Sequence, residues 1–182
     1  MASIAAIAHV ELKTKLRGES LGTAVKIEGS KLKSEDVVST SEGTSVAVKN
    51  LFFNIPARRN FLKSDPVELR HIMDEFHRVA MAHSQINFSM HHNDNDLFDL
   101  RSEPFRQRII HIFGAKMIEK LVPVQEDTEL LKISGFVGKP EFAKKSRGEQ
   151  FFFVNHRFIK SSYLNHCLLY TSDAADDTLW VV

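Results

Sequence analysis

The sequence predicts an α+β fold, and three observations carry this prediction. Residues 9–53 mostly alternate between polar and apolar side chains and are punctuated by glycines, which is typical of antiparallel strands. Residues 65–80 instead repeat apolar side chains every three or four positions, which is typical of an amphipathic helix. Residues 86–160 combine both rhythms. We therefore expect a sheet in the first half and mixed helices and strands in the second.

The first half is predicted to begin as a short helix and to continue as strands. Residues 1–9 look like the last turns of a helix, because no capping residue precedes their apolar positions. The predicted strands are residues 9–16, 22–29 and 43–53. We expect the last of these to run through Phe52 and Phe53, which would then point to opposite faces. Pro56 lacks a backbone donor and ends the ladder.

The second half is predicted to open with a helix at Asp65, with Pro66 in its first turn. The further expected elements are a hairpin over 86–101, a helix after 104, strands over 121–125 and 129–137, and a strand with a turn over 150–160. Ser102 is the expected cap of the second helix. The core face of that helix is expected to be Phe105, Ile109, Ile110 and Phe113. Asn155 and His156 mark the turn in the last strand.

The two rhythms meet near Ser64, which divides the chain into residues 1–63 and residues 64–168. Residues 169–182 drop the amphipathic pattern, turn acidic and finish on hydrophobic side chains. We expect this last stretch to be a tail that is disordered or not native to the domain.

Composition places the protein among intracellular globular proteins. Its 182 residues carry 24 basic and 23 acidic side chains, so the net charge is +1 and any contact with DNA must come from a local patch. The only cysteine, Cys167, cannot form an internal disulfide, which fits a reducing cytoplasm. No apolar run approaches the roughly 18 residues that span a bilayer, so no membrane partner is expected.

The most distinctive stretch is the polar corner that follows the third predicted strand. Asn54 can satisfy backbone groups in a turn, and Pro56 cannot continue the sheet. Arg58 and Arg59 supply fixed positive charge where the chain leaves the sheet. From these residue properties alone, we interpret the corner as a structural junction between domains.

At this corner the sequence resembles the MutL family of DNA mismatch repair proteins. The stretch GTSVAVKNLFFNIPARRNFLK is similar to the family signature, in which a Gly-Thr strand leads into Leu-Phe-(Phe/Tyr)-Asn-x-Pro-Ala-Arg. Phe52, Phe53, Asn54, Pro56 and Arg58 carry the match. The stretches ASIAAIAHVELKTK and QFFFVNHRFIKSSYLNH resemble the family's preceding and following segments, in the expected order.

The resemblance implies a fold and a cellular role. Residues 1–63 would be the C-terminal part of an ATPase sheet of the GHKL superfamily, and residues 64–168 a truncated transducer domain of the ribosomal-protein fold type. Such proteins dimerise through the ATPase domain when ATP binds. They couple a mismatch-recognition protein to a repair nuclease and helicase on DNA, in the bacterial cytoplasm at the nucleoid.

The resemblance also implies where the ATPase chemistry lies. The family's catalytic Glu, its Mg²⁺-binding Asn and its adenine-reading Asp-x-Gly-x-Gly would precede Met1, and a Lys that reaches the γ-phosphate would follow the matched part. ATP and Mg²⁺ are therefore the expected cofactors of a longer parent protein. The chain itself is expected to be a fragment with no catalytic residue, no bound cofactor and no ATP turnover.

Thr44 is the one residue that the resemblance assigns to the nucleotide. It matches the family's Gly-Thr position near the adenine pocket, where a hydroxyl can join the polar network around the exocyclic amine. A threonine in a strand also has an ordinary explanation, because β-branched residues favour strands.

A basic cluster near the end of the second half is the candidate DNA contact. It consists of Lys139, Lys144, Lys145, Arg147 and Arg157. Each cation that neutralises a phosphate releases counterions, so a few of them give weak, salt-sensitive and sequence-independent binding. The alternative is that the charged loop is only solvated.

Residues 90–99 hold histidines and aspartates but do not predict a metal site. His91 and His92 are adjacent on a predicted strand and point to opposite faces, and no known ligand spacing is completed.

Two other functions compete with a MutL-like repair protein. One is a non-enzymatic α+β module that binds nucleic acid through the basic loop. The other is a segment of another GHKL ATPase, such as a type II topoisomerase subunit, which the Phe-Phe-Asn-Ile-Pro-Ala-Arg corner does not favour.

Overall fold

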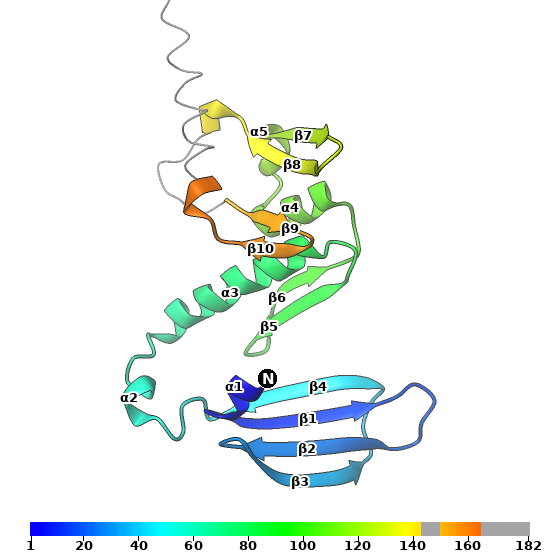
Figure 1. The fold of residues 1–182 in the computed structure, drawn as a ribbon, viewed down its shortest axis with the longest axis vertical. Coiled ribbons are helices and arrows are strands. Elements are labelled where there is room, and N and C mark those ends of the chain that lie inside the picture. The colour runs from blue at the N-terminus through cyan, green and yellow to red at the C-terminus, as the bar shows by residue number, and fades with distance from the viewer. Residues whose placement is uncertain (143–149, 165–182) are drawn as a thin grey trace, which may run out of the picture. The chain divides into compact units, whose positions relative to one another are not determined.

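A computed structural model describes residues 1–142 and 150–164 and divides into two compact units (Figure 1). The sheet unit is Met1–Glu68 and the second unit begins at Leu69, so the division falls in the first turn of the helix α3 (Asp65–Ala82). The two units together confirm the α+β class. Lys144, Lys145, Arg147, Cys167 and the predicted tail 169–182 lie outside the described residues.

The sheet unit is a four-stranded antiparallel sheet with a short helix before it. The helix is α1 (Ala2–Ala5), and the strands are β1 (His9–Lys15), β2 (Gly22–Glu28), β3 (Lys31–Val38) and β4 (Gly43–Lys49). Their order is β3-β2-β1-β4. The three predicted strands are confirmed at β1, β2 and β4, and β3 is an additional strand. Its charged, exposed side chains give a weak alternation, which explains why the pattern did not separate it.

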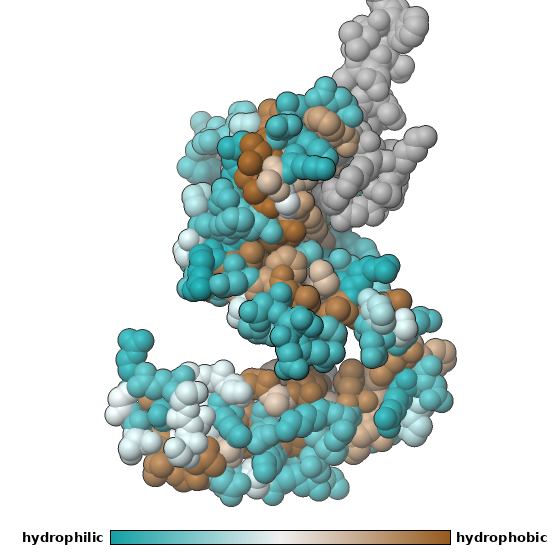
Figure 2. All heavy atoms as spheres, turned by 180° about the vertical axis from the view of Figure 1, so that it is seen from behind, coloured by the Kyte–Doolittle hydropathy of each residue, from teal (hydrophilic) through white to brown (hydrophobic). Residues whose placement is uncertain are grey.

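Register places apolar side chains on one face of this sheet. Val10 pairs with Ile27 and Val48, and Leu12 pairs with Val25 and Val46, so these side chains share a face. Val10 is buried. Towards both sheet edges this face is exposed, and Figure 2 shows apolar surface on the unit. The exposed members are Leu32, Val37, Val46 and Val48.

The polar corner differs from the prediction. β4 ends at Lys49, so Phe52 and Phe53 do not lie on a strand. Asn50 and Phe52 have φ angles of 52° and 62°, which turn the chain out of the ladder before the proline. The Phe52 N–H donates to the Ile7 carbonyl at 2.8 Å. The strand therefore ends through a left-handed backbone turn tied to the segment after α1, and not through the missing proline donor.

The second half of the corner behaves as expected for a turn and a helix start. The Asn54 side chain donates to the Ala6 carbonyl at 2.9 Å, which satisfies backbone at the turn. Pro56 opens the four-residue helix α2 (Pro56–Arg59) in its first turn. The Phe53 ring lies edge-on to His9, with 4.4 Å between ring centroids.

The second unit combines helices with three two-stranded sheets. After α3 come the hairpin of β5 (Phe88–His92) and β6 (Asn95–Leu100), the helices α4 (Phe105–Phe113) and α5 (Met117–Lys120), and the pair β7 (Leu121–Asp127) and β8 (Lys132–Gly138). The short 3-10 helix η1 (Pro140–Phe142) and the pair β9 (Phe152–Val154) and β10 (Arg157–Ile159) complete the described part. These elements confirm the predicted helices, hairpin and strands, with shifts at their ends.

The predicted cap of α4 is wrong. The N-cap position is Pro104, whose ψ of 147° is not helical, so the helix starts at Phe105. Ser102 lies too early to reach the first turn. Its N–H instead donates to the side-chain oxygen of Asn87 at 2.6 Å, which fastens the end of β6 to the start of β5.

The turn predicted in the last strand is confirmed as a hairpin. Asn155 and His156 have φ angles of 50° and 63°, and β9 and β10 pair on either side of them. Two successive positive φ angles are the geometry of a type I′ turn, whose twist suits a two-residue hairpin.

A half-buried histidine of the second unit lies among aromatic rings. His77 of α3 contacts Phe98 at 5.2 Å and Phe113 at 5.7 Å between ring centroids. Its Nε2 is buried and has no hydrogen-bond partner among the described residues. Burial lowers the pKa of His77, and the negative charge of Asp74 acts in the opposite direction.

We expect the second unit to lose stability in mild acid through His77. The folded pKa lies below the unfolded value of 6.5, so the unfolded chain binds a proton first as pH falls. Stability should therefore be complete above that value and decrease as pH falls below it. Thermal unfolding of the chain at pH values above and below 6.5 measures the effect. His77→Phe should flatten the pH dependence, whereas His71→Phe, exposed on the same helix, should keep it.

Neither a metal centre nor a membrane-spanning helix is found in the part of the chain that the structure describes. No group of three His, Cys, Asp or Glu side chains there could hold a metal ion. His91 pairs with Asp96 at 2.6 Å instead. None of the described helices is long and apolar enough to cross a bilayer.

Candidate functional site

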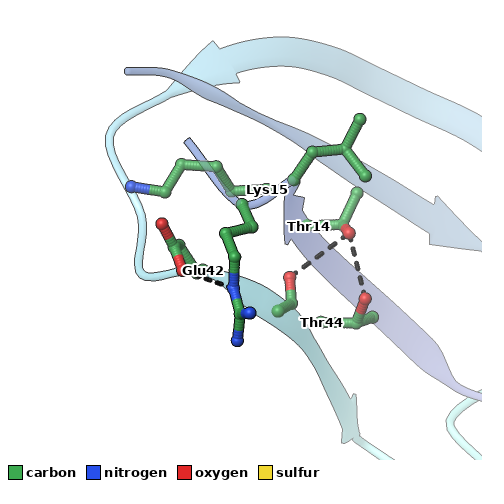
Figure 3. A pocket seen from close by; sticks show the side chains of 7 residues that line it. Thr14, Lys15, Glu42 and Thr44 are labelled. Atoms are coloured by element: carbon green, nitrogen blue, oxygen red, sulfur yellow. Dashed lines mark hydrogen bonds and ion pairs between the residues drawn. The ribbon is translucent and has the colours of Figure 1, made fainter. Parts of the chain in front are cut away.

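The candidate site is an open pocket of about 490 Å³ in the sheet unit (Figure 3). It lies where β1 ends and β4 begins. It is lined by Thr14, Lys15, Leu16, Arg17, Glu42, Gly43 and Thr44. The sequence-predicted residue Thr44 therefore does line a pocket, together with a second hydroxyl, two cations and a carboxylate.

Two threonine hydroxyls meet at the pocket wall. Thr14 and Thr44 are directly opposite in the antiparallel pairing of β1 with β4, so both side chains lie on the same face. Their Oγ1 atoms are 2.9 Å apart. The Thr14 hydroxyl also lies 3.3 Å from the Gly43 carbonyl oxygen, to which it can donate. Figure 3 shows both interactions converging on the Thr14 oxygen.

At the rim of the pocket, side-chain and backbone contacts connect the loop after β1 with the loop before β4. Arg17 Nε lies 3.8 Å from Glu42 Oε2, and the Gly18 N–H donates to Glu42 Oε1 at 3.1 Å. Gly18 has a φ of 84°, a conformation that favours glycine. The Arg17–Glu42 ion pair is exposed, so it contributes only about 0–1 kcal/mol to stability. The hydrogen bond from the Gly18 N–H to Glu42 is therefore the more important contact between the two loops.

The family-signature residues divide between a second pocket and the turn. Phe53 lines a pocket of about 380 Å³ with His9, Asn50, Leu51, Arg59 and Leu62. Phe52, Asn54, Pro56 and Arg58 form the turn and α2 without lining either pocket. In this second pocket, Asn50 Nδ2 lies 3.1 Å from His9 Nδ1.

Two of the predicted DNA-contacting cations are described: Lys139 directly follows one two-stranded sheet, and Arg157 lies in another. Lys139 follows β8, and its N–H donates to the Lys120 carbonyl at 2.8 Å. Arg157 begins β10, opposite Val154 of β9, and is exposed. Lys144, Lys145 and Arg147 belong to the undescribed segment between these sheets.

Sequence reasoning missed two residues that the structure makes prominent. Thr14 looks like an ordinary strand residue, and only the register with β4 brings it to Thr44. Arg108 of α4 is fully buried, with its side chain against the end of α3 and the ends of the β5–β6 hairpin. Its only sequence signal is its position three residues after Phe105, on the predicted core face of the helix.

Comparison with known proteins identifies relatives along most of the chain. Residues 109–175 match the family model described as "DNA mismatch repair protein, C-terminal domain". The chain is 68% identical over 168 residues to "DNA mismatch repair protein MutL" of Christiangramia forsetii, which covers 92% of this chain and 27% of that protein. The chain belongs to the MutL family. The resemblance inferred from the signature motif is thereby confirmed.

Other MutL relatives and solved structures agree. The MutL protein of Flavobacterium psychrophilum is 66% identical over 93% of this chain and 28% of that protein. The chain thus spans about a quarter of the length of these curated MutL proteins. Among solved structures, "Aquifex aeolicus MutL ATPase domain complexed with ADP" matches with a TM-score of 0.76 at 22% identity, over 92% of this chain and 65% of that one. That match shows the fold.

Proposed function

We propose that this MutL segment belongs to a longer, ATP-dependent DNA mismatch repair protein. In this proposal ATP binding drives homodimerisation, and the protein couples a mismatch-recognition protein to a repair nuclease and helicase. It acts on DNA in the bacterial cytoplasm, at the nucleoid. The observation that carries the nucleotide part is the pocket containing Thr44, in a sheet whose fold matches a MutL ATPase domain solved with ADP.

The two units have separate roles in the proposal. Residues 1–63 contribute the Thr44 side of an ATP pocket in a GHKL-type ATPase domain, and residues 64–168 form a transducer domain. The two cations of the pocket, Lys15 and Arg17, suit a polyanionic ligand such as a nucleotide. Mg²⁺ would accompany the phosphates of the nucleotide.

The affinity of the full-length protein for ATP tests the nucleotide part. We expect saturable ATP binding together with ATP-dependent dimerisation, measured by calorimetry and by sedimentation. A full-length protein that binds no ATP at millimolar concentration would contradict the proposal.

The DNA part rests on exposed positive charge in the second unit. Arg157 lies at the start of β10, with no ion-pair partner among the residues described. Contact through such cations to phosphate is independent of sequence. This charge also supports the second candidate, a nucleic-acid-binding module that uses no ATP, and the ATP measurement separates the two.

We expect Arg157→Ala in the full-length protein to weaken DNA binding equally for all sequences. Loss of one phosphate contact should reduce the slope of log affinity against log salt concentration by about 1. Fluorescence anisotropy on two unrelated duplexes over a salt series measures this. The matched control is Arg101→Ala, because Arg101 is also exposed beside a hairpin but is paired with Asp99 at 2.9 Å. Equal slopes for both variants would exclude Arg157 from the interface.

A further inference from the structure

We propose that the second pocket of the sheet unit binds an acidic peptide segment of a partner protein, in which a carboxylate stands next to a large apolar side chain. The volume of this pocket is about 380 Å³. It is lined by His9, Asn50, Leu51, Phe53, Arg59 and Leu62. None of these residues lines the Thr44 pocket. The proposed peptide site is therefore separate from the proposed nucleotide site.

The lining of the second pocket carries a fixed positive charge and no acidic side chain. Arg59 is exposed and forms no ion pair with any residue that the structure describes. In the Thr44 pocket, by contrast, Arg17 lies 3.8 Å from Glu42, which lines the same pocket. An unpaired guanidinium presents a planar fork of donors that matches the two oxygens of a carboxylate. Arg59 is thus the residue that would bind the acidic group of the peptide.

The carboxylate of Glu28, which lies near this pocket, does not take the place of an acidic ligand. Its Oε1 is 3.9 Å from His9 Nδ1, and its Oε2 is 3.6 Å from Lys33 Nζ. Glu28 does not line the pocket, and Lys33 offsets its charge. The pocket therefore keeps the positive charge that an acidic ligand requires.

Three apolar side chains form the rest of the pocket wall. Leu51, Phe53 and Leu62 are 41%, 40% and 43% exposed. The Phe53 ring lies edge-on to His9, and a Cβ added at Gly29 would lie 3.5 Å from Phe53 Cζ, so the ring is held from two sides. Covering such a surface with an apolar side chain is favourable. The peptide should therefore carry an apolar side chain beside its carboxylate.

The backbone of the corner fixes these side chains around the pocket. Asn50 has a φ of 52°, and the Phe53 N–H donates to the Asn50 carbonyl at 3.0 Å. The Leu62 N–H donates to the Arg59 carbonyl at 3.2 Å, in the turn that follows α2. Because the wall is already formed, a ligand would not have to order it, and this lowers the cost of binding.

The open form of the pocket favours a peptide over a free small molecule. Sites for small molecules usually bury about 70–90% of the ligand surface. The apolar walls here are shallow enough to remain about 40% exposed. A segment of a partner protein needs to place only one carboxylate and one apolar side chain in such a pocket, while the rest of the partner stays outside it.

Saturation-transfer NMR on the full-length protein tests the proposal. The probe is a glycine–serine peptide with blocked ends and a central Asp-Leu pair, present in excess over the protein. We expect a dissociation constant below about 1 mM. Replacing the peptide Asp by Asn, or Arg59→Gln in the protein, should raise this constant by about tenfold, because charge-assisted hydrogen bonds are lost. Leu62→Ala should raise it by about threefold through lost apolar contact.

Arg58→Gln is the matched control, because Arg58 is also exposed in α2 but lines neither pocket. It should leave peptide binding unchanged. Equal affinities of the Arg58→Gln and Arg59→Gln variants would overturn the proposal, as would no saturation transfer to the peptide at millimolar concentration. If Arg59→Gln does not fold, the two peptides decide, and equal affinities for the Asp and Asn peptides overturn the proposal. N-acetylleucine that binds as tightly as the peptide would assign the pocket to a free carboxylic acid and overturn the peptide assignment.

Discussion

Arg108→Ala is expected to destabilise the second unit by about 3–5 kcal/mol, which is the usual cost of removing one partner of a buried ion pair. The side chain of Arg108 is completely buried. Its Nε donates to Glu103 Oε1 at 3.0 Å, and the Glu103 side chain is itself only 9% exposed. Without the guanidinium, that carboxylate would remain buried with only His111 beside it, at 2.7 Å.

The backbone contacts of Arg108 explain why the loss would spread. Nη1 donates to the Ala80 carbonyl in the last turn of α3 at 3.1 Å. Nη2 lies within 2.9 Å of the carbonyls of Ser84, Ile86 and Arg101. One side chain thus donates hydrogen bonds to backbone carbonyls at the C-terminal end of α3, just before β5 and just after β6. The Ala80 carbonyl would be left buried without this donor, and the other three, which are part-buried, would also lose theirs.

Urea unfolding followed by circular dichroism measures this effect. A typical domain is stable by about 5–15 kcal/mol, so a loss of this size removes much of the total. Arg106→Ala is the matched control, because Arg106 is exposed on the same helix. It should change stability by less than about 0.5 kcal/mol. Arg108→Lys should fall between the two, since it keeps the charge but not the planar fork that reaches several acceptors. Equal stability of the two alanine variants would refute the role assigned to Arg108.

The elements that sequence predicted well are those with a strong local rhythm. β1, β2 and β4 follow from alternation, and α3 from its apolar spacing and the Asp65–Pro66 start. The hairpin turn at Asn155 follows from residue chemistry, because asparagine tolerates the positive φ that the turn requires. These features are local, so a single sequence contains them.

The features that sequence mispredicted or missed depend on tertiary contacts. Phe52 continues an apolar run but is turned out of β4 by a hydrogen bond to Ile7. Thr14 meets Thr44 only because the pairing of β1 with β4 brings together two residues that are 30 positions apart in the sequence. Arg108 looks like a surface cation until the carbonyls around it are assembled from other elements. Thr44 was assigned through the family resemblance, and the structure adds the pocket and the hydroxyl pair around it.

Gly22→Ala is the second substitution with a large expected effect, and it acts on the candidate site. A Cβ at Gly22 would collide with the Thr14 carbonyl oxygen and would lie 2.8 Å from Thr40 Cγ2. The first of these atoms is backbone in β1 and cannot swing aside, so the β1–β2 pairing must shift. Overpacking of this kind typically costs about 1–3 kcal/mol, and we expect the upper end here because a strand has to move.

The steric origin of this effect can be separated from the general cost of replacing a glycine. A Cβ at Gly135 in β8 would have no atom within 4 Å, and the φ of Gly135 is not in the left-handed region. Gly135→Ala should therefore change stability by less than about 0.5 kcal/mol in thermal unfolding. Gly22→Ala should in addition weaken ATP binding by the full-length protein, because a displaced Thr14 carbonyl moves the hydroxyl that meets Thr44. Full stability of Gly22→Ala would mean that the strands tolerate this collision, and the close approach of β2 to Thr14 would then play no part in shaping the pocket.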